Sequence, residues 1–584
     1  MAAGNRSVLV ILDSRRVAER AGAECTIFAA LDHMGVSYEV LECADYWALP
    51  PRHLAPRAAY VIAHDGAGAG LKPDTAAALA EAVAQGTGLV SFDREMAAWP
   101  PALRALLPGE LTTETTESIR IENETFVTGG HHCGETIELQ RPLAVAGIPN
   151  DADLESLVAT AEGTVVVAAG QRDEGRIVLF GTGNALYDES VFGHVRGLDG
   201  LLWRSLVWVA AKPFPTRSIP PFVTARIDDC NGTYSAFDYV NAFNRAGISP
   251  NIGLFTDELG PTDWKAAKRL FDAGGADFSM HAFRDDFYKA RPNYKPFSLL
   301  ADKPDLSHGG QQTAFEGLSM DHTTGRDLDS ATVRQNFRRM DDAFGKAGIR
   351  HSRVLNAHFG EIGWRAVPEF LARKVDLPTN NSVVGQLYGN QPDWRPKPYG
   401  VRGTNGRYGL VIDRCPQHPG MTCVGMSVSH LGKTHMVTDI LHGHTPFLGE
   451  ADSAKPGLAI ERGINNVTIG LDSLAYGIIM THEERIDAIS LDDWSRIVTG
   501  IAQGLGSWDA IFASRESVSI TCKRLFDSAL VHADWDGQAL HCELCGQTEG
   551  ASPLTVWHNT ETECARTIAD IPAIAGFATV DLPG

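Results

Sequence analysis

The chain has 584 residues, of which 44% are apolar and 21% charged, a globular composition on a length that exceeds one ordinary core. Its 51 basic and 72 acidic residues give a formal net charge of −21, which repels phosphate backbones and anionic lipid, so nucleic acid is not an expected partner. The apolar runs fall short of the roughly 18 residues of a membrane span, and the run near the start is too short for a signal peptide. We therefore expect a soluble, multidomain protein, cytoplasmic by default, and the residues leave an exported form open.

Strand and helix signals alternate over residues 7–210. Apolar runs such as "SVLVIL" at 7–12 and "GLVSFD" at 88–93 are separated by segments with helical spacing, among them the Ala-rich stretch 74–86. This alternation predicts a doubly wound α/β domain over residues 1–212, with a parallel sheet between two layers of helices. The pattern resembles the class I glutamine-amidotransferase-like domains, whose catalytic members carry a Cys at the turn after a strand. The comparable turn in this chain has no Cys, so we expect the domain to be non-catalytic.

A proline-rich segment, "AKPFPTRSIPPF" at 211–222, holds four prolines in twelve residues and is typical of a linker. Beyond it the alternation resumes and predicts a (β/α) barrel, complete or incomplete, over residues 221–522. Short alternating strands at 526–584 predict a small C-terminal β-sandwich. In a barrel of this kind the chemistry sits at the C-terminal ends of the strands.

Ionisable side chains end several strands of the predicted barrel. Strand ends converge in a barrel, so these side chains should face one pocket; the alternative is that each one only caps a helix or bonds a nearby loop. Carboxylate and imidazole groups suit a divalent ion, for which zinc is our first choice, and such an ion lowers the pKa of water toward neutrality. The residues are Asp228 and Asp229 after the first strand, His281 with Asp285, His358, and His482 with Glu483.

Short motifs in this order resemble those of the carbohydrate-esterase polysaccharide deacetylases: "RIDD" at 226–229, a His-ended strand, "NAHFGE" at 356–361 and "IIMTH" at 478–482. The closer resemblance is to the deacetylase part of heparan sulfate N-deacetylase/N-sulfotransferases, in which "CPQHPGMTCVG" at 415–425 is similar to a "PRQTCG"-like segment. The resemblance covers residues 222–515, and no sulfotransferase region is evident. It implies a metal-dependent N-deacetylase that acts on an N-acetylated amino-sugar polysaccharide or oligosaccharide.

The resemblance also implies roles for individual residues. Asp228 becomes the general base and Asp229 a metal ligand. His281 becomes a second metal ligand, and His482 becomes the general acid that protonates the leaving amine. Adjacent aspartates on a strand point to opposite sides, but at a strand end, where the backbone turns, one can bind the metal while the other faces the water.

The third metal ligand has two candidates. The family's second His lies four residues after the first, and that place after His281 holds Asp285, which can also bind zinc. The other candidate is His322, in "SMDHTTGRDL". If residues 284–320 are an insertion that splits the motif, His322 is the motif's second His and binds the metal. The residues do not choose between the two.

His358 has a different expected role from the resemblance. It would contact the substrate or stabilise the oxyanion that forms during hydrolysis. The backbone N–H of Phe359 or Gly360 would then be the hydrogen-bond donor to that oxyanion.

Two other functions stay open at this point. A metal-independent glycoside hydrolase needs two carboxylates beside the scissile bond, which Asp228 with Glu361 or Glu483 could supply. A non-catalytic glycan-binding protein would use the N-terminal and C-terminal domains as binding modules around an inactive barrel. Loss of activity on chelation separates the metal-dependent enzyme from the glycoside hydrolase. The oligomeric state is not set by the sequence.

Overall fold

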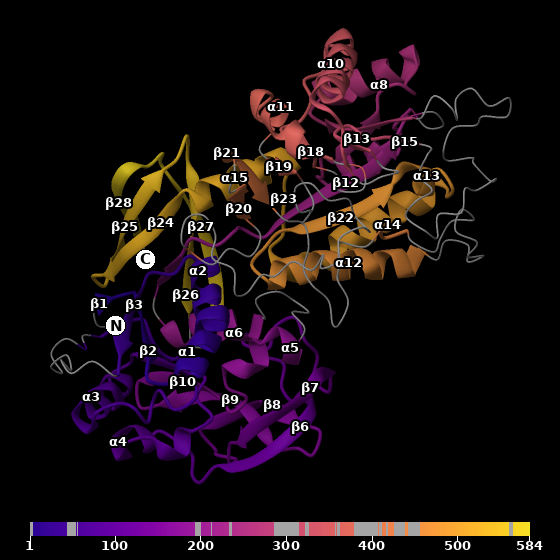
Figure 1. Ribbon diagram of the computed structural model, residues 1–584. Coiled ribbons are helices and arrows are strands. Elements are labelled where there is room, and N and C mark those ends of the chain that lie inside the picture. Colours follow the sequence, from indigo (N-terminus) through magenta and orange to yellow (C-terminus); the bar gives the residue numbers. More distant parts are fainter. Residues whose placement is uncertain are drawn as a thin grey trace.

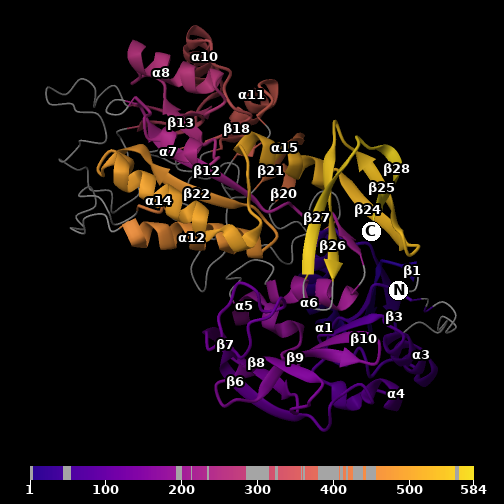
Figure 2. The same ribbon diagram turned by 180° about the vertical axis from the view of Figure 1, so that it is seen from behind.

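The computed structural model shows an N-terminal α/β part, drawn in indigo and purple, and a second α/β part, drawn in magenta to orange (Figure 1). The yellow C-terminal strands lie beside both, as the view from behind also shows (Figure 2). The structure describes residues 4–43, 54, 56–192, 200–211, 213–232, 236–284, 315–321, 326–356, 358, 362–375, 377–378, 407, 412–415, 418–424, 439–441, 456–559 and 564–583.

A nine-stranded sheet forms the core of the N-terminal part, in the order β3-β2-β4-β5-β10-β9-β8-β6-β7. Its first five strands are parallel. Val8 and Val10 pack under helices α2 and α6, whereas Leu9 and Ile11 pack under α3 on the other face, because successive side chains of a strand alternate in direction. The elements are β2 (Val8–Leu12), β3 (Tyr38–Glu42), β4 (Ala59–Ile62), β5 (Gly88–Ser91), β10 (Gly175–Phe180), α1 (Val17–Ala23), α2 (Ala29–Met34), α3 (Pro73–Ala84) and α6 (Gly200–Ala210).

The other half of this sheet is antiparallel, so the prediction of a parallel sheet is wrong there. The physical reason is visible between β9 and β10, which are joined by the two residues Asp173 and Glu174, with Asp173 at a φ of 52°. A two-residue turn can join antiparallel strands only, since a parallel pair needs a crossover of roughly a dozen residues. The strands of this half are β6 (Thr112–Ile121), β7 (Thr136–Gly147), β8 (Leu154–Thr160) and β9 (Val165–Arg172).

The second α/β part is built on the strand order β15-β14-β13-β12-β22, with β23 also paired to β12. Strands β14, β13, β12 and β22 run parallel, as the predicted barrel requires. Within the described ranges no strand pair closes this sheet into a barrel, and β18 pairs separately with β19. The strands are β12 (Phe222–Cys230), β13 (Asn251–Phe255), β14 (Asp277–Arg284), β15 (Phe315–Glu316), β18 (Val354–Leu355), β19 (Leu377–Pro378), β22 (Gly477–His482) and β23 (Ile511–Phe512).

Amphipathic helices cover this sheet and share one hydrophobic cluster with it. Trp494 of α14 is fully buried and meets the ring of Phe243 of α7 at 5.3 Å between centroids. Asp329 caps the longest of these helices, α10, by accepting hydrogen bonds from its first turn. The helices are α7 (Val240–Arg245), α8 (Pro261–Asp272), α10 (Ser330–Ala347), α11 (Val367–Ala372), α12 (Pro456–Asp472), α13 (Glu483–Ile486) and α14 (Leu491–Gly504). Helix α15 (Arg515–Phe526) packs against β22 in a separate hydrophobic cluster.

Two antiparallel sheets form the C-terminal part, and side chains of both meet in one hydrophobic cluster. One sheet has the order β1-β24-β25-β28 and the other the order β11-β26-β27. Strand β1, which precedes the N-terminal α/β part, completes the first sheet, and β11, which precedes the second α/β part, completes the other. The strands are β1 (Gly4–Asn5), β11 (Phe214–Thr216), β24 (Ser528–Trp535), β25 (Ala539–Gln547), β26 (Ser552–Asn559), β27 (Cys564–Ile571) and β28 (Ala575–Pro583).

The connection between α12 and β22 docks on the N-terminal part. Asp472 forms a buried ion pair with Arg204 of α6, at 2.6 Å, and its backbone carbonyl accepts a hydrogen bond from the indole of Trp203. Leu474 packs into the N-terminal hydrophobic cluster. The start of β22 is therefore held by the N-terminal part. Among the helices in the described ranges, none is both long and apolar enough to cross a bilayer.

Candidate metal centre

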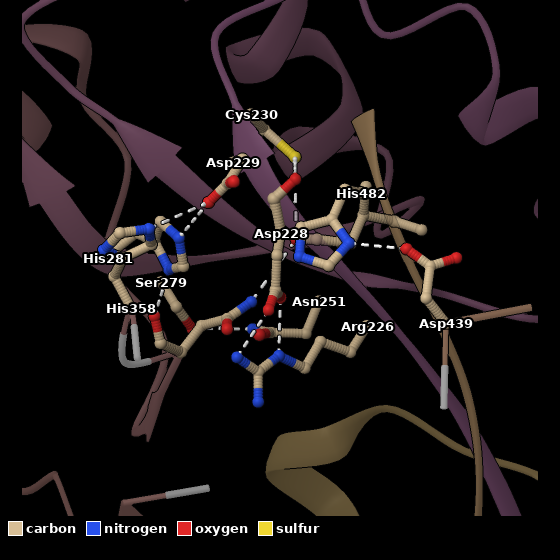
Figure 3. A network of polar contacts seen from close by, with 12 residues as sticks. Arg226, Asp228, Asp229, Cys230, Asn251, Ser279, His281, His358, Asp439 and His482 are labelled. Carbon is tan, nitrogen blue, oxygen red and sulfur yellow. Dashed lines mark hydrogen bonds and ion pairs between the residues drawn. The ribbon is translucent and has the colours of Figure 1, made fainter. Parts of the chain in front are cut away.

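The strand-end residues that the structure describes come together at the C-terminal ends of β12, β14 and β22 (Figure 3). The parallel register of β12 with β22 places Asp228 directly beside His482. His281 of β14 lies against Asp229, with its Nε2 2.7 Å from Oδ1 of that carboxylate. Figure 3 shows Asp228 between the histidine pair on one side and His482 on the other.

A bulge at the end of β12 separates the two adjacent aspartates. Ile227 pairs with Ile252 and Cys230 with Leu254, so β12 carries one residue more than β13 over this stretch. Asp229 takes the left-handed conformation, with a φ of 55°, which aspartate tolerates better than most residues. A bulge of this kind re-aims side chains, and here it turns Asp229 toward His281.

Asp229, His281 and His358 form the one group of potential metal ligands that the described part of the chain contains. One ligand atom from each residue lies within 4.8 Å of the other two, and all three side chains are buried. Nε2 of His358 is 3.7 Å from Oδ1 of Asp229, and the two imidazole rings meet edge to face at 5.1 Å. One carboxylate and two imidazoles that leave further positions open are a ligand set typical of catalytic divalent ions.

The hydrogen bonding of His281 fits a metal ligand. Its Nδ1 hydrogen-bonds the backbone carbonyl of Asn356, and a carbonyl can only accept, so Nδ1 carries the proton. Nε2 is then left to face Asp229 and an ion, the arrangement in which metal-binding histidines are usually held. Gly253 of β13 makes room for this contact, since a Cβ there would lie 2.7 Å from the Asn356 amide nitrogen and 3.0 Å from Nδ1 of His281.

Asp228 is held by Arg226, two residues earlier on β12. Both carboxylate oxygens accept from this guanidinium, at 2.5 and 2.6 Å. Burial opposes ionisation of Asp228, but the charge of Arg226, together with His281 and His482, outweighs it and lowers the pKa of Asp228 to about 2. Asp228 is therefore a fixed anion and a weak base.

His482 is oriented by Asp439, which the sequence analysis did not single out. Nδ1 of His482 lies 2.6 Å from Oδ2 of Asp439, whose other oxygen accepts from the Thr481 hydroxyl and from the backbone N–H of Leu441. Burial works against the imidazolium, but the hydrogen bond to Asp439 and the charge of Glu484 raise the pKa of His482 to about 10. His482 is thus positively charged at neutral pH, as a general acid must be before it donates.

Glu483, a candidate carboxylate of the glycoside-hydrolase alternative, is used to hold the chain. Its Oε2 accepts from the backbone N–H groups of Asn231 and Gly232, and its Oε1 accepts from the hydroxyl of Tyr239 at 2.9 Å. Burial raises the pKa of Glu483 to about 8. Its hydrogen bonds fix the turn after β12 and leave this side chain poorly placed for catalysis.

The remaining predicted residues lie outside the described ranges, so neither candidate for the third ligand is placed. His358, which was predicted to contact the substrate, lies in the potential ligand group. Arg226, Asn356 and Asp439 support the site without having been predicted, and of these only Arg226 had a visible signal, a charge inside an apolar strand. The predicted residues outside the described ranges are Asp285, His322, Phe359, Gly360 and Glu361.

Comparison of the sequence with protein-family models and with curated proteins finds no match. Among solved structures, a cytoplasmic protein from Salmonella typhimurium LT2 is similar at 13% identity, with a TM-score of 0.21, over 26% of this chain and 75% of the other. The PurLQS structure from Thermotoga maritima is similar at 14% identity, with a TM-score of 0.22, over 32% of this chain and 91% of the other. Scores this low establish neither a shared fold nor an activity.

Proposed function

We propose that the chain is a metal-dependent amide hydrolase that removes N-acetyl groups from an amino-sugar polysaccharide or oligosaccharide. The observation that carries this proposal is the buried group of Asp229, His281 and His358 on one side of Asp228, with the charged His482 on the other. Metal-assisted amide hydrolysis needs a group of metal ligands, a carboxylate that can accept the proton of water, and a charged acid that can protonate the leaving nitrogen. The resemblance of the "RIDD" and "IIMTH" strand ends to polysaccharide deacetylases supplies the substrate class.

Each residue then has a defined task. A divalent ion, for which zinc is the first choice, would be held by Asp229, His281 and His358 and would polarise the amide carbonyl and acidify the attacking water. Asp228, fixed by Arg226, accepts a hydrogen bond from that water. When the water attacks the amide carbonyl carbon it becomes strongly acidic, and Asp228 then takes its proton. His482, held by Asp439, gives a proton to the leaving nitrogen.

The finer fold assignments belong to the same proposal. The parallel strands β14, β13, β12 and β22 would be part of a barrel of the polysaccharide-deacetylase type. The two C-terminal sheets, which share one hydrophobic cluster, would be a small β-sandwich. The N-terminal part would be a non-catalytic relative of the glutamine-amidotransferase-like domains.

Product analysis tests the proposal against the glycoside-hydrolase alternative. Purified protein supplied with zinc is incubated with N-acetylated oligosaccharides of glucosamine and of galactosamine, and acetate and new reducing ends are measured in the same samples. The proposal predicts acetate without new reducing ends, and none from the Asp228→Asn variant. New reducing ends without acetate would support the two-carboxylate mechanism, and saturable binding without either product would support a glycan-binding protein.

A further inference from the structure

Glu484 contributes a buried carboxyl to the site that the mechanism above does not use. It is the second residue of α13 and only 7% exposed. Its Oε2 is buried and has no hydrogen-bond partner among the described residues. Its Oε1 has one long contact, 3.8 Å from Nε of Arg485. A buried acceptor that lacks a donor is rare in folded proteins and marks a place where a ligand can supply one.

Glu484 lies on the side of the site where the leaving group must be. Asp228 pairs with His482 across β12 and β22, so the residues just after His482 continue beside the end of β12. Nε of Arg485 lies 3.8 Å from Oε1 of Glu484 and 3.0 Å from Oδ2 of Asp439, the carboxylate that binds His482. Helix α13 also packs against β12, the strand that carries Asp229. It therefore stands close to the acid that protonates the leaving nitrogen and to the potential ligand group.

Two other acidic groups nearby already have charged partners. Asp228 is occupied by Arg226, and Asp439 binds His482 at 2.6 Å and lies 3.0 Å from Nε of Arg485. Burial holds the pKa of Glu484 above its usual range, which a cation bound beside it would counteract. Among the described residues, Oε2 of Glu484 is the one buried carboxyl oxygen of this site that lacks a hydrogen-bond donor.

Resting on the proposed function, we propose that Glu484 binds the amino group that hydrolysis releases, so that the enzyme acts on amides of primary amines. His482 protonates the nitrogen of the tetrahedral adduct that water forms with the amide, and the C–N bond then breaks to release a primary amine and acetic acid. The amine takes the acidic proton of the acetic acid and becomes an ammonium group at this position. The ammonium offers hydrogen-bond donors and a positive charge, both of which Oε2 of Glu484 can accept. An ester substrate would release an alcohol, which needs no such carboxylate.

Titration calorimetry with zinc-loaded protein tests this inference. The probes are glucosamine, at a pH that keeps its amine protonated, and uncharged N-acetylglucosamine. Relative to the wild type, Glu484→Gln is expected to bind glucosamine about tenfold or more weakly and N-acetylglucosamine within about twofold. Equal loss for both probes, unchanged glucosamine affinity, or no glucosamine binding by the wild type would overturn the inference.

Matched variants and a parallel assay keep the outcome clear. Asp492→Asn, a change at an exposed acid on α14, should leave both affinities unchanged. Glu484→Asp keeps the charge on a shorter side chain and should bind glucosamine with intermediate affinity, and thermal denaturation checks that each variant is folded. If the wild type releases acetate but Glu484→Gln binds glucosamine as tightly as the wild type does, the inference about Glu484 is wrong and the proposed hydrolysis stands. Glucosamine binding that depends on Glu484, without acetate release, upholds the amine site and overturns the proposed hydrolysis.

Discussion

Nε2 of His281 lies 2.7 Å from Oδ1 of Asp229, while the opposite nitrogen of the same ring faces the carbonyl of Asn356. Since Nδ1 carries the proton, Nε2 and the carboxylate oxygen would be two acceptors in contact unless a cation lies between them or the ring is doubly protonated. His358 brings a third potential ligand atom to the same place. A metal ion satisfies all three groups at once.

Replacement of any of these three side chains should abolish metal binding. We expect Asp229→Asn, His281→Ala and His358→Ala to lower zinc affinity by more than the roughly 10–100-fold that outer-shell changes cost. Free zinc at about 100 times its Kd should stabilise the wild type by about 2.7 kcal/mol and leave the variants unchanged. Thermal denaturation with and without zinc, together with metal analysis, measures both effects.

His132→Ala is the matched control for this series, because that imidazole is 87% exposed on the N-terminal part. It should retain full zinc stabilisation. Asp229→Asn is the most informative variant, since asparagine also tolerates the left-handed backbone of the bulge. If Asp229→Asn binds zinc as the wild type does, the assigned ligand group is wrong.

Asp439→Asn should move the alkaline limit of activity. The pKa of His482 is raised from 6.5 to about 10, so the charged pair stabilises the fold fully below pH 6.5 and loses this contribution as the pH rises through 10. Activity, which needs the imidazolium, should fall over the same upper range. In Asp439→Asn the pKa of His482 drops, so the alkaline limit of activity should move to a lower pH. At neutral pH the activity should fall roughly 10–100-fold.

The pH–rate profile, supported by NMR titration of His482, checks this prediction. Asp492→Asn changes an exposed acid in the first turn of α14 and serves as the control. It should leave the alkaline limit in place. An unchanged limit in Asp439→Asn would contradict the role of the pair.

Gly253→Ala should disturb the metal centre without replacing a ligand. The new Cβ would come within 3.0 Å of Nδ1 of His281 and closer still to Asn356, which pushes the imidazole from its position. We expect a loss of zinc affinity of roughly tenfold or more. Gly345→Ala in α10 is the control, because its Cβ would meet no atom within 4 Å and should stabilise the helix by about 0.5–1 kcal/mol. Equal zinc affinity in both variants would contradict the steric argument.

Arg204→Ala should destabilise the chain strongly. Asp472 has a fully buried side chain, and removal of its partner leaves a buried charge uncompensated, at a cost of about 3–5 kcal/mol in the free energy of unfolding. Urea denaturation measures this cost. Asp272→Ala breaks the exposed pair with Lys268 and should cost no more than about 1 kcal/mol. Comparable effects in the two variants would show that the buried pair does not hold the connection before β22.

Much of the strand framework could be predicted from the sequence, because buried parallel strands are continuous apolar runs. The apolar run at 8–12 and the partly apolar segment at 222–230 are both strands at the positions expected. The antiparallel half of the N-terminal sheet could not be predicted from apolar runs alone. Its direction depends on short turns such as Asp173–Glu174, which carry no apolar signal.

The candidate site was predictable where an ionisable residue ends an apolar strand, as at Asp229, His281 and His482. Asp439 could not be found in this way, because no long apolar run precedes it in the sequence and it lies 43 residues before its partner His482. The placement of His358 in the ligand group depends on how β14 and the segment after β18 approach each other. Distances of a few ångströms between segments that far apart in sequence are set by packing, which strand patterns do not describe.

The most direct test of the account is acetate release from N-acetylated oligosaccharides by the metal-stripped protein and by the same protein after zinc is restored, with Asp229→Asn treated in parallel. A metal-dependent site predicts acetate release by the zinc-restored wild type, none by the stripped protein, and none by Asp229→Asn under either condition. Acetate release that persists after metal removal, or that zinc restores equally in Asp229→Asn, would contradict a hydrolytic site built on Asp229, His281 and His358.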